Sequence, residues 1–348
     1  MSRRLPAEWE PQRGVLLTWP HPDSDWAPHL ERIEPVYQAL VAAVAPREPV
    51  VVACRDEAHR ARIGRQLAGN PAVRLVIAAS DDTWIRDYGP LGVIDDDGLR
   101  LLDLAFDGWG GKYPAARDDA ATRALHATGA LGPHPLETHP LVLEGGSIDS
   151  DGAGTLLTTE RCLSCRSQEG VAGRGDWERP LARLLGADRV LWLTAGALTG
   201  DDTDGHVDML ARFCAPDTIA YTACDDPADP DYSGLQAMAA ELGALRQRDG
   251  RPYRLLRLPI PAPIHSAQGA RLPASYANFL IVNDAVLLPV YDDPADAHAR
   301  RELARAFPER AIVPIPARAL IEQNGSVHCA TMQLAAAPAG RAAAAAGD

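Results

Sequence analysis

The chain of 348 residues is 46% hydrophobic and 23% charged, so it can bury a large core in one large domain or two ordinary ones. Its formal net charge of -13 argues against a nucleic-acid-binding surface and mildly favours cationic small molecules as partners. No segment approaches the roughly 18 apolar residues that a membrane helix requires, and no apolar stretch follows the basic N-terminal residues. We therefore expect a cytoplasmic protein without a membrane or nucleic-acid partner, whose six scattered cysteines are free thiols.

Helical periodicity and short apolar runs alternate along the chain. After a first predicted strand at 14–19, a unit of one helix followed by one strand occurs five times. The predicted helices cover 29–45, 57–67, 177–185, 235–245 and 296–307, and the strands that follow them cover 50–54, 73–78, 189–193, 254–258 and 311–315. A sixth helix near 118–131 complicates the count, and turn signals at Asp97-Gly98, Asp151-Gly152 and Asn283-Asp284 predict hairpins between these units. The mixture predicts the α/β or α+β class, and the recurrence favours a cyclic, propeller-like arrangement.

No linker separates two domains, because proline and glycine are spread evenly over the chain. We therefore predict one domain over residues 1–334. Residues 335–348, rich in alanine, glycine and proline, have little to bury and are predicted to be a disordered tail, with helix as the alternative for its alanine-rich part. The oligomeric state stays open, and a homo-oligomer is allowed.

An acidic run, Gly200–Asp208, leads into the apolar segment that ends at Phe213. If 206–213 is a strand, as its apolar content predicts, His206 and Asp208 project from the same face. The carboxylate then anchors a cation while the imidazole transfers protons. A solvated acidic turn at the mouth of a strand explains the same residues, and this run alone does not decide between the two.

Two further segments carry acids beside turn signals. Trp84 and Asp87 lie between a predicted strand and the Gly89-Pro90 turn, and a tryptophan face with a carboxylate suits a planar cation. The alternative places Trp84 in the core, with Asp87 either bridged to Arg86 or capping the turn. Glu144 precedes two glycines that let backbone approach a site closely, although a plain glycine turn has the same sequence.

Cys329 is a candidate nucleophile because it follows a flexible Gly325-Ser326 pair near the end of the chain. If 327–331 is extended, His328 points away from this thiol, and His206 becomes the better candidate for its base. The alternative is an inert buried cysteine.

Other patterns argue against a metal or a cofactor. Cys162 and Cys165 form a single CxxC pair without a second pair or a histidine at ligand spacing, which leaves incidental thiols or a redox pair. The glycine-rich stretch Gly108–Gly111 lacks the G-x-G-x-x-G order, and no Walker-type lysine motif occurs. The sequence therefore predicts neither a metal site nor a phosphate-binding loop.

The same segments, taken together, resemble the agmatine deiminases. The matching motifs, in order, are 82–90, 106–113, 143–149 with 154–160, 205–208, 275–279 and 328–329, and the opening segments 6–11 and 19–21 are similar too. The resemblance spans about residues 6–333. That family includes bacterial-type peptidylarginine deiminases and belongs to the guanidine-modifying superfamily, so the resemblance implies a fivefold pseudosymmetric α/β propeller of the pentein type.

The resemblance also implies roles for individual residues. Cys329 would attack the guanidinium carbon, while Asp87 and Asp208 hold the guanidinium nitrogens. His206 would protonate the departing ammonia and then activate water, and Glu144 would orient His206. The expected substrate contacts are Trp84, Trp109 and Asn278, where Asn278 has the alternative of satisfying backbone groups in a turn. Water then releases a ureido product from a covalent amidino-thioether, N-carbamoylputrescine if the substrate is agmatine, without a metal or redox cofactor.

Two segments depart from the family pattern. Many agmatine deiminases carry a triple glycine and an asparagine ahead of the His-Cys pair, where this chain has Gln323–Val327. The loop Cys162–Arg166 also differs from the usual loop of the family. Because both are candidates to line the pocket for the substrate tail, the sequence predicts deimination more firmly than it predicts agmatine. A deiminase of free or peptidyl arginine, an amidinotransferase and a non-catalytic protein that binds cationic amines are the other hypotheses.

Overall fold

The computed structural model describes residues 3–338 apart from 68–69, 167 and 169. Within this part of the chain the strands form five sheets. The first has the order β16 (Thr331–Ala335), β1 (Gln12–Thr18), β2 (Val50–Cys54) and β3 (Val73–Ile77). The others are β4 (Leu91–Asp95), β5 (Gly98–Ala105), β6 (Leu136–Val142); β7 (Ile148–Ser150), β8 (Thr155–Thr159), β9 (Arg189–Leu193); β10 (Ala211–Ala215), β11 (Thr218–Ala223), β12 (Arg254–Pro259); and β13 (Leu280–Val282), β14 (Ala285–Val290), β15 (Ala311–Pro316).

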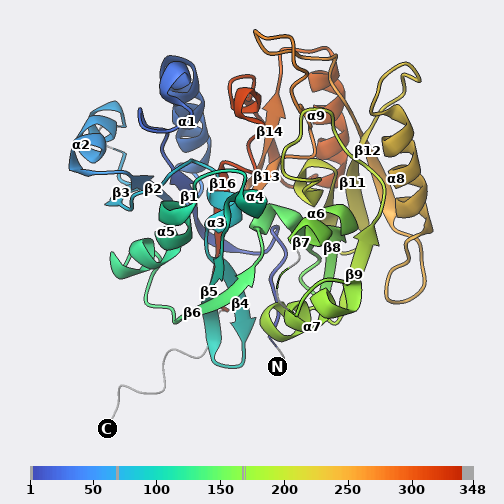
Figure 1. Cartoon of the computed structure of the whole chain (residues 1–348), viewed down its shortest axis with the longest axis horizontal. Helices are drawn as coiled ribbons and strands as arrows, with labels where there is room; N and C mark the ends of the chain where they lie inside the picture. Colours follow the sequence, from blue (N-terminus) through green and yellow to red (C-terminus); the bar gives the residue numbers. More distant parts are fainter. Residues whose placement is uncertain (1–2, 68–69, 167, 169, 339–348) are drawn as a thin grey trace.

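Each sheet repeats one topology: an antiparallel pair, a helix, and a strand parallel to the second member of the pair. The connecting helices are α1 (Leu30–Val44), α5 (Ala116–Ala127), α7 (Arg174–Leu185), α8 (Tyr232–Ala244) and α9 (Ala295–Ala306). Figure 1 shows the sheets following one another around the molecule, with short helices between them. The predicted α/β class and the repetition of one unit are confirmed.

The count of units needs one correction. The predicted unit 57–78 is real, but its helix α2 (Glu57–Gln66) and strand β3 only extend the first sheet. The helix that complicated the count, α5, instead connects β5 to β6 in a sheet of its own. The remaining helices are short: α3 (Ile85–Tyr88), α4 (Gly108–Gly111), α6 (Glu160–Cys165), and the 3-10 turns η1 (Ala27–His29), η2 (Gly145–Ser147), η3 (Val207–Met209) and η4 (Leu320–Gln323).

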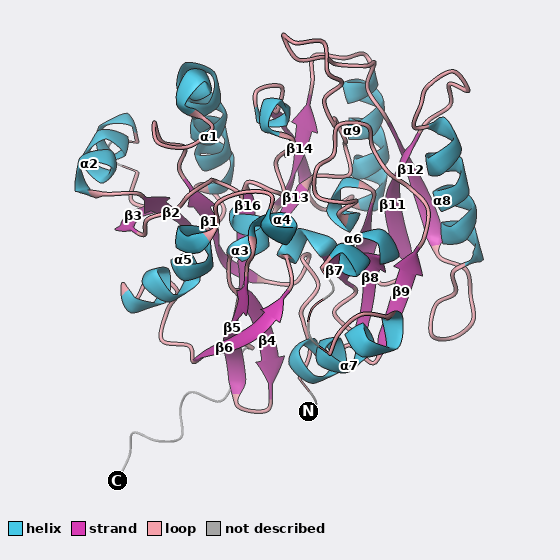
Figure 2. Ribbon diagram, in the orientation of Figure 1, coloured by secondary structure: helices cyan, strands magenta, loops and turns pink. Residues whose placement is uncertain are grey.

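Burial explains why the strands were visible in the sequence. All residues of β2, β8 and β11 are buried, as their continuous apolar or threonine-containing runs predict. The last strand of each sheet lies at an edge and is only partly buried; β12 and β15, for example, include exposed residues. The five connecting helices lie outside the strands (Figure 2) and bury residues at helical spacing, such as Ile33, Tyr37 and Leu40 of α1.

The two ends of the described chain meet in the first sheet. Strand β16 pairs antiparallel with β1, so that Leu16 faces Met332. This pairing brings the turn before β16, which carries Cys329, to α3, where the Arg86 N–H donates to the Cys329 carbonyl at 3.3 Å. Ala335 ends β16 and so belongs to the sheet, although the prediction assigned it to the tail; residues 339–348 of that tail lie outside the described residues. None of the helices described here is long and apolar enough to cross a membrane.

Two predicted strands are wrong at the positions that matter most. Residues 206–210 form the 3-10 turn η3 and its caps, and β10 starts only at Ala211. Residues 327–330 are turns rather than extended chain, and β16 starts at Thr331. His206, Asp208 and Cys329 therefore lie on turns just before buried strands, where their side chains can converge.

Candidate active site

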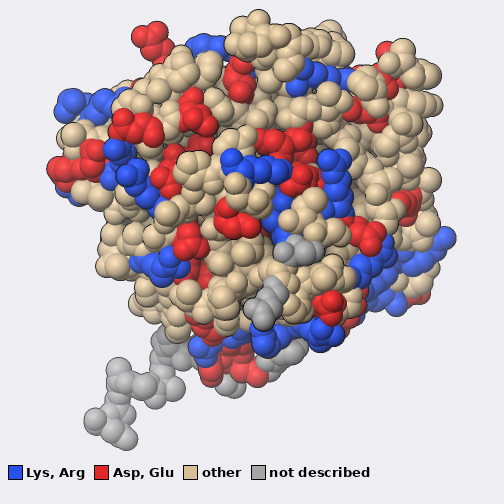
Figure 3. All heavy atoms as spheres, in the orientation of Figure 1, with Lys and Arg blue, Asp and Glu red and all other residues tan. Residues whose placement is uncertain are grey.

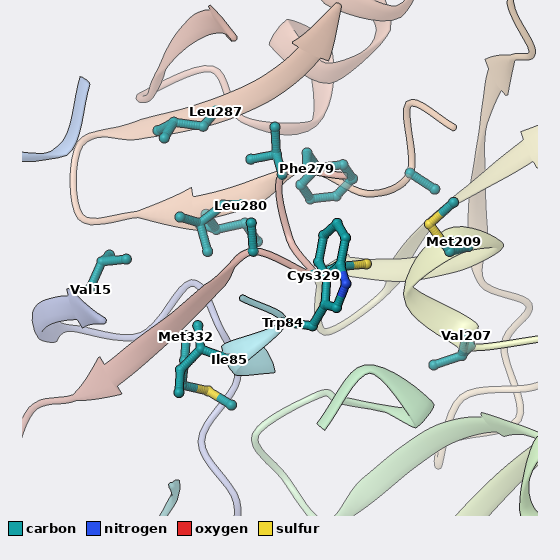
Figure 4. Packing of buried hydrophobic residues seen from close by; sticks show 14 of the residues in the cluster. Val15, Trp84, Ile85, Val207, Met209, Phe279, Leu280, Leu287, Cys329 and Met332 are labelled. Carbon is teal, nitrogen blue, oxygen red and sulfur yellow. The ribbon is translucent and has the colours of Figure 1, made fainter. Parts of the chain in front are cut away.

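A cavity of about 420 Å³ opens where these turns meet. Its lining residues come from segments far apart in the sequence: Asp25, Asp82, Trp84, Asp87, Trp109, Tyr113, Asp202, Thr203, Gln323, Asn324, Gly325 and Cys329. Figure 4 shows the Trp84 ring next to the Cys329 sulfur. Four of the lining residues are aspartates and none is Lys or Arg, so the cavity suits a cation. On the outer face drawn in Figure 3, by contrast, acidic and basic side chains are interspersed.

Cys329 is held by Asn278. The Asn278 Nδ2 donates to the Cys329 Sγ at 3.2 Å, and its Oδ1 accepts from the backbone N–H of His328 at 2.9 Å and of Cys329 at 3.3 Å. Asn278 is fully buried and is not one of the residues that line the cavity. The role of Asn278 as a substrate contact stays a prediction, and its hydrogen bonds to two backbone N–H groups are those of the alternative role. It orients the nucleophile candidate.

Asp87 reaches the cavity from α3 with both carboxylate oxygens bonded. Its Oδ2 accepts from the Trp109 indole N–H at 2.9 Å, and its Oδ1 accepts from the backbone N–H of Gly146 at 2.9 Å. The pairing of Asp87 with Arg86 that the sequence left open is not what the structure has, because Arg86 donates to the His328 carbonyl and to Gln333. Burial raises the pKa of Asp87 to about 6. The charge of His206 lowers this pKa, and the charges of Asp208 and Glu144 raise it.

Asp208 is fixed from the opposite side by His328. The His328 Nδ1 lies 2.7 Å from the Asp208 Oδ2, and its Nε2 lies 2.8 Å from the Glu8 Oε2. Each ring nitrogen of His328 therefore has a carboxylate oxygen as its partner. Burial opposes ionisation of Asp208, but the hydrogen bond and charge of His328 hold its pKa below the ordinary value. Its Oδ1 is buried without a hydrogen-bond partner in the described part of the protein, which leaves this oxygen available to a ligand.

His206 lies between two acids and is fully buried. Its Nδ1 is 3.6 Å from the Asp87 Oδ1, and its Nε2 is 3.5 Å from the Glu144 Oε2. Burial disfavours the imidazolium, yet the charge of Asp87 and the neighbouring Cys162 and Glu144 raise the pKa of His206 well above its ordinary value. Glu144 itself is bonded by the Arg166 Nε. Burial alone would raise the pKa of Glu144, but the contacts with His206 and Arg166 lower it.

Gly146 shows how closely these groups converge. A Cβ atom on Gly146 would lie 2.6 Å from the His206 Nδ1, 2.7 Å from the Asp87 Oδ1 and 3.1 Å from the Asp208 Oδ2. The two acids therefore face one another near the same point, with the histidine beside them. Gly325 has a similar role toward Trp84, since a Cβ there would lie 2.3 Å from its ring. Both positions require glycine because the neighbouring side chains lie too close to leave room for a Cβ atom.

The sequence does not predict the contacts that hold Asp208 and its neighbours in place. Glu8 lies in the opening motif and His328 lies beside Cys329, but nothing in their spacing predicts that they meet. Of the two altered segments, Gln323–Gly325 lines the cavity as expected. The other, Cys162–Arg166, is not among the lining residues; its Arg166 instead binds Glu144 and, at 2.7 Å, the Asp204 Oδ2.

Comparison with known proteins agrees with this geometry. The model of the Porphyromonas-type peptidyl-arginine deiminase family matches residues 4–335. The chain belongs to this family. An agmatine deiminase of Stutzerimonas stutzeri is 36% identical over 352 residues, covering 94% of each chain. The family resemblance found in the sequence is thereby confirmed.

Solved structures give the same result. A C. jejuni agmatine deiminase that carries a Cys-to-Ser substitution and bound substrate superposes with a TM-score of 0.89 at 33% identity, covering 95% of this chain and 96% of the other. A Porphyromonas gingivalis structure whose name proposes an arginine deiminase superposes with a TM-score of 0.89 at 43% identity, covering 95% and 98%. Family members of this fold thus carry names with different guanidino substrates.

Proposed function

We propose that this protein hydrolyses a guanidino group to a ureido group and ammonia through a covalent adduct on Cys329. The observation that carries the proposal is that Cys329 and Asp87 line one acidic cavity, while the His206 ring and a carboxylate oxygen of Asp208 converge with Asp87 at Gly146. A guanidinium is resonance-stabilised, so its carbon reacts only when the cation is held firmly and a strong nucleophile attacks. Asp87 and Asp208 supply the hold and Cys329 supplies the sulfur.

The cation itself activates the thiol. Burial raises the pKa of the Cys329 thiol well above its ordinary value, and the charges of Asp208 and Asp87 raise it further. A guanidinium between the two acids offsets their charge, so the thiolate forms when substrate is bound and the proton passes to solvent in the cavity. The sulfur then adds to the guanidinium carbon.

His206 completes both half-reactions. As an imidazolium it gives a proton to the departing nitrogen, so that ammonia leaves and an amidino-thioether stays on Cys329. The neutral imidazole then removes a proton from water, which attacks the same carbon. The C–S bond breaks, the ureido product leaves, and His206 is again protonated. Glu144, held by Arg166, keeps the ring oriented.

Agmatine suits the cavity better than arginine does. Its second cation would face Asp25, Asp82 and Asp202, whereas the carboxylate of free arginine would meet these acids without a lysine or arginine among the lining residues. The proposed reaction is therefore agmatine plus water to N-carbamoylputrescine plus ammonia. The agmatine deiminase names of two relatives support this choice.

The test is an assay of agmatine, free arginine and a peptidyl arginine for both ammonia and ureido product, with Cys329→Ser as the inactive control. We expect stoichiometric ammonia and N-carbamoylputrescine from agmatine. Turnover of an arginine substrate but not of agmatine would overturn the choice of agmatine and keep deimination. Ammonia release by Cys329→Ser at the rate of the unaltered protein would overturn the mechanism.

Asp202 provides a matched test of the substrate tail. Its Oδ2 accepts from the Tyr113 hydroxyl at 2.8 Å and from the Asn324 Nδ2 at 2.9 Å, which fixes the carboxylate at the cavity lining. Asp202→Asn should raise the KM for agmatine about tenfold, the effect of losing one charged contact of about 1.4 kcal/mol, and should change the KM of a neutral-tailed alkylguanidine much less. Equal effects on the two substrates would contradict the role of Asp202 in binding the tail.

Gly146→Ala should abolish most activity without unfolding the protein. The new Cβ would push against Asp87 and His206, and a displacement of about 1 Å at reacting groups costs about a hundredfold in rate. The measurement is kcat/KM for agmatine together with the thermal unfolding midpoint. Gly175→Ala is the matched control, because a Cβ there meets no atom within 4 Å. Full activity of Gly146→Ala would mean that the two acids do not act at this point.

Acidification should reduce kcat/KM as the pH falls through about 6, where Asp87 takes up a proton and loses its charge. Glu144 and Asp208 have lowered pKa values and stay ionised in this range, and the guanidinium of the substrate stays charged. Asp82 is the control, because burial raises its pKa to about 6 as well. Asp82→Asn should keep the acidic limb of the pH profile; loss of the limb in this variant would assign it to Asp82.

A further inference from the structure

A second cluster of side chains includes His206 and contributes no residue to the cavity lining. It consists of Cys162, Glu144 and His206, whose Sγ, carboxylate oxygen and ring nitrogen all lie within 4.8 Å of one another. The Cys162 Sγ is 4.0 Å from the Glu144 Oε2, and the His206 Nε2 is 3.5 Å from the same oxygen. All three residues are fully buried. The proposed reaction uses Glu144 and His206 but gives no task to Cys162.

The donor set and its spacing match a zinc-type ion. Cysteine sulfur, histidine nitrogen and carboxylate oxygen are the protein ligands of Zn²⁺, with bonds of about 2.0–2.3 Å. Tetrahedral bonds of that length place the donor atoms roughly 3.3–3.8 Å apart. The observed 3.5 Å between nitrogen and oxygen lies within this range, and the 4.0 Å between sulfur and oxygen lies slightly above it, a difference that a small rotation of the Cys162 side chain removes.

The surroundings of His206 and Glu144 leave their donor atoms available. The His206 nitrogens are buried and make no hydrogen bond within the described residues. Arg166 binds the Glu144 Oε1, which leaves the Oε2 directed toward His206 and Cys162 and supplies the outer contact that orients a ligating carboxylate. Cys165, the other member of the CxxC pair, is exposed and is not part of the cluster. The fold thus supplies the histidine that the local spacing around Cys162 lacked.

From these contacts we infer that Cys162, Glu144 and His206 form an inhibitory binding site for a zinc-class divalent cation. Asp87, which lines the cavity, lies 3.6 Å from the His206 Nδ1 and is the lining residue nearest to this ring in the contacts described above. Binding releases the thiol proton of Cys162 and the proton on the His206 Nε2, and forms metal–sulfur, metal–nitrogen and metal–oxygen bonds. The inhibition rests on the proposed function, because a metal on the Nε2 prevents the imidazole from transferring protons.

The binding test is a titration of the metal-free protein with Co²⁺, which reports a thiolate ligand by a sulfur-to-metal charge-transfer band. We expect one Co²⁺ per chain with this band, and displacement by Zn²⁺. Cys329→Ala should keep the band, because its sulfur is not a ligand in this site. Cys165→Ala should keep it too, whereas Cys162→Ala and the isosteric Cys162→Ser should lose it and weaken the affinity by at least about tenfold, the smallest effect of losing even an outer contact.

Inhibition is measured separately as the Zn²⁺ concentration that halves the rate of ammonia release. Cys162→Ala should turn over substrate and need at least about tenfold more Zn²⁺ than Cys165→Ala. A band that persists in both Cys162 variants, or disappears in Cys329→Ala, would overturn the site, as would a protein that binds no Co²⁺. A protein that binds Co²⁺ as described but is inactive toward every guanidino substrate would keep the site and reject the proposed function.

Discussion

Replacing Cys329 with serine should lower kcat for agmatine by about four orders of magnitude or more, the usual effect of removing a covalent nucleophile. The serine oxygen keeps the position that Asn278 sets, but its hydroxyl ionises far less readily than a thiol, even beside a bound cation. Ammonia release at saturating agmatine measures the effect. Because the fold around the turn is unchanged, substrate binding should persist, and isothermal titration should show it.

The control for Cys329→Ser is Cys165→Ser, which alters an exposed thiol outside the cavity lining. It should retain the full rate. A Cys329→Ser protein that turns over agmatine within about tenfold of the unaltered protein would exclude the covalent route, since no single general-base effect replaces a nucleophile so completely.

Replacing His206 with asparagine should lower kcat by about 10²- to 10⁴-fold, the range of one general acid–base group. The effect arises twice, because His206 both protonates the departing ammonia and activates water. Asparagine also removes the imidazolium charge that faces Asp87 and Glu144, so the pKa of Asp87 should rise and the acidic limb of kcat/KM should move to higher pH. The measurement is the pH profile of kcat/KM beside kcat at its optimum.

His126→Asn is the matched control for His206→Asn, because His126 lies on α5 and its Nε2 donates one hydrogen bond to the His134 carbonyl. Its kcat and pH profile should match those of the unaltered protein. A His206→Asn protein with unchanged kcat would remove the histidine from the reaction and leave the acidic cavity as a binding site.

The repeated unit could be predicted from the sequence because its elements differ in hydrophobic period. Helices such as α9 show a narrow apolar stripe through Ala299 and Leu303, and central strands such as β2 are continuous apolar runs. Which strand joins which sheet was not predictable, since the order depends on pairings between distant segments. The closure of β1 by β16 is one such pairing.

The turns that carry the reactive groups were mistaken for strands for a physical reason. Val207, Met209 and Leu210 are buried like strand residues, yet the chain before them reverses through Asp204 and Gly205, both with positive φ. An apolar pattern reports burial and not backbone conformation, and a tightly packed turn produces the same letters. The same holds for Val327 and its neighbours before β16.

Motif matching identified the residues that line the cavity, but not the groups that hold them. Trp84, Asp87, Trp109 and Cys329 all line one cavity, as the resemblance implied. The contact between Glu8 and His328 spans 320 positions, and no local pattern encodes it. The motif around Asn278 was clear, but the direction of its amide, toward the Cys329 sulfur and the backbone N–H groups of His328 and Cys329, depends on the packing of the turn.

The most direct test of the central claim is to quench the protein with acid during turnover of agmatine and map the modified peptide by mass spectrometry. The account predicts a single adduct with the mass of agmatine less ammonia, on the Cys329 sulfur, absent from Cys329→Ser. A steady-state sample that turns over agmatine without an adduct on any cysteine, or with the adduct on Cys162, would contradict it.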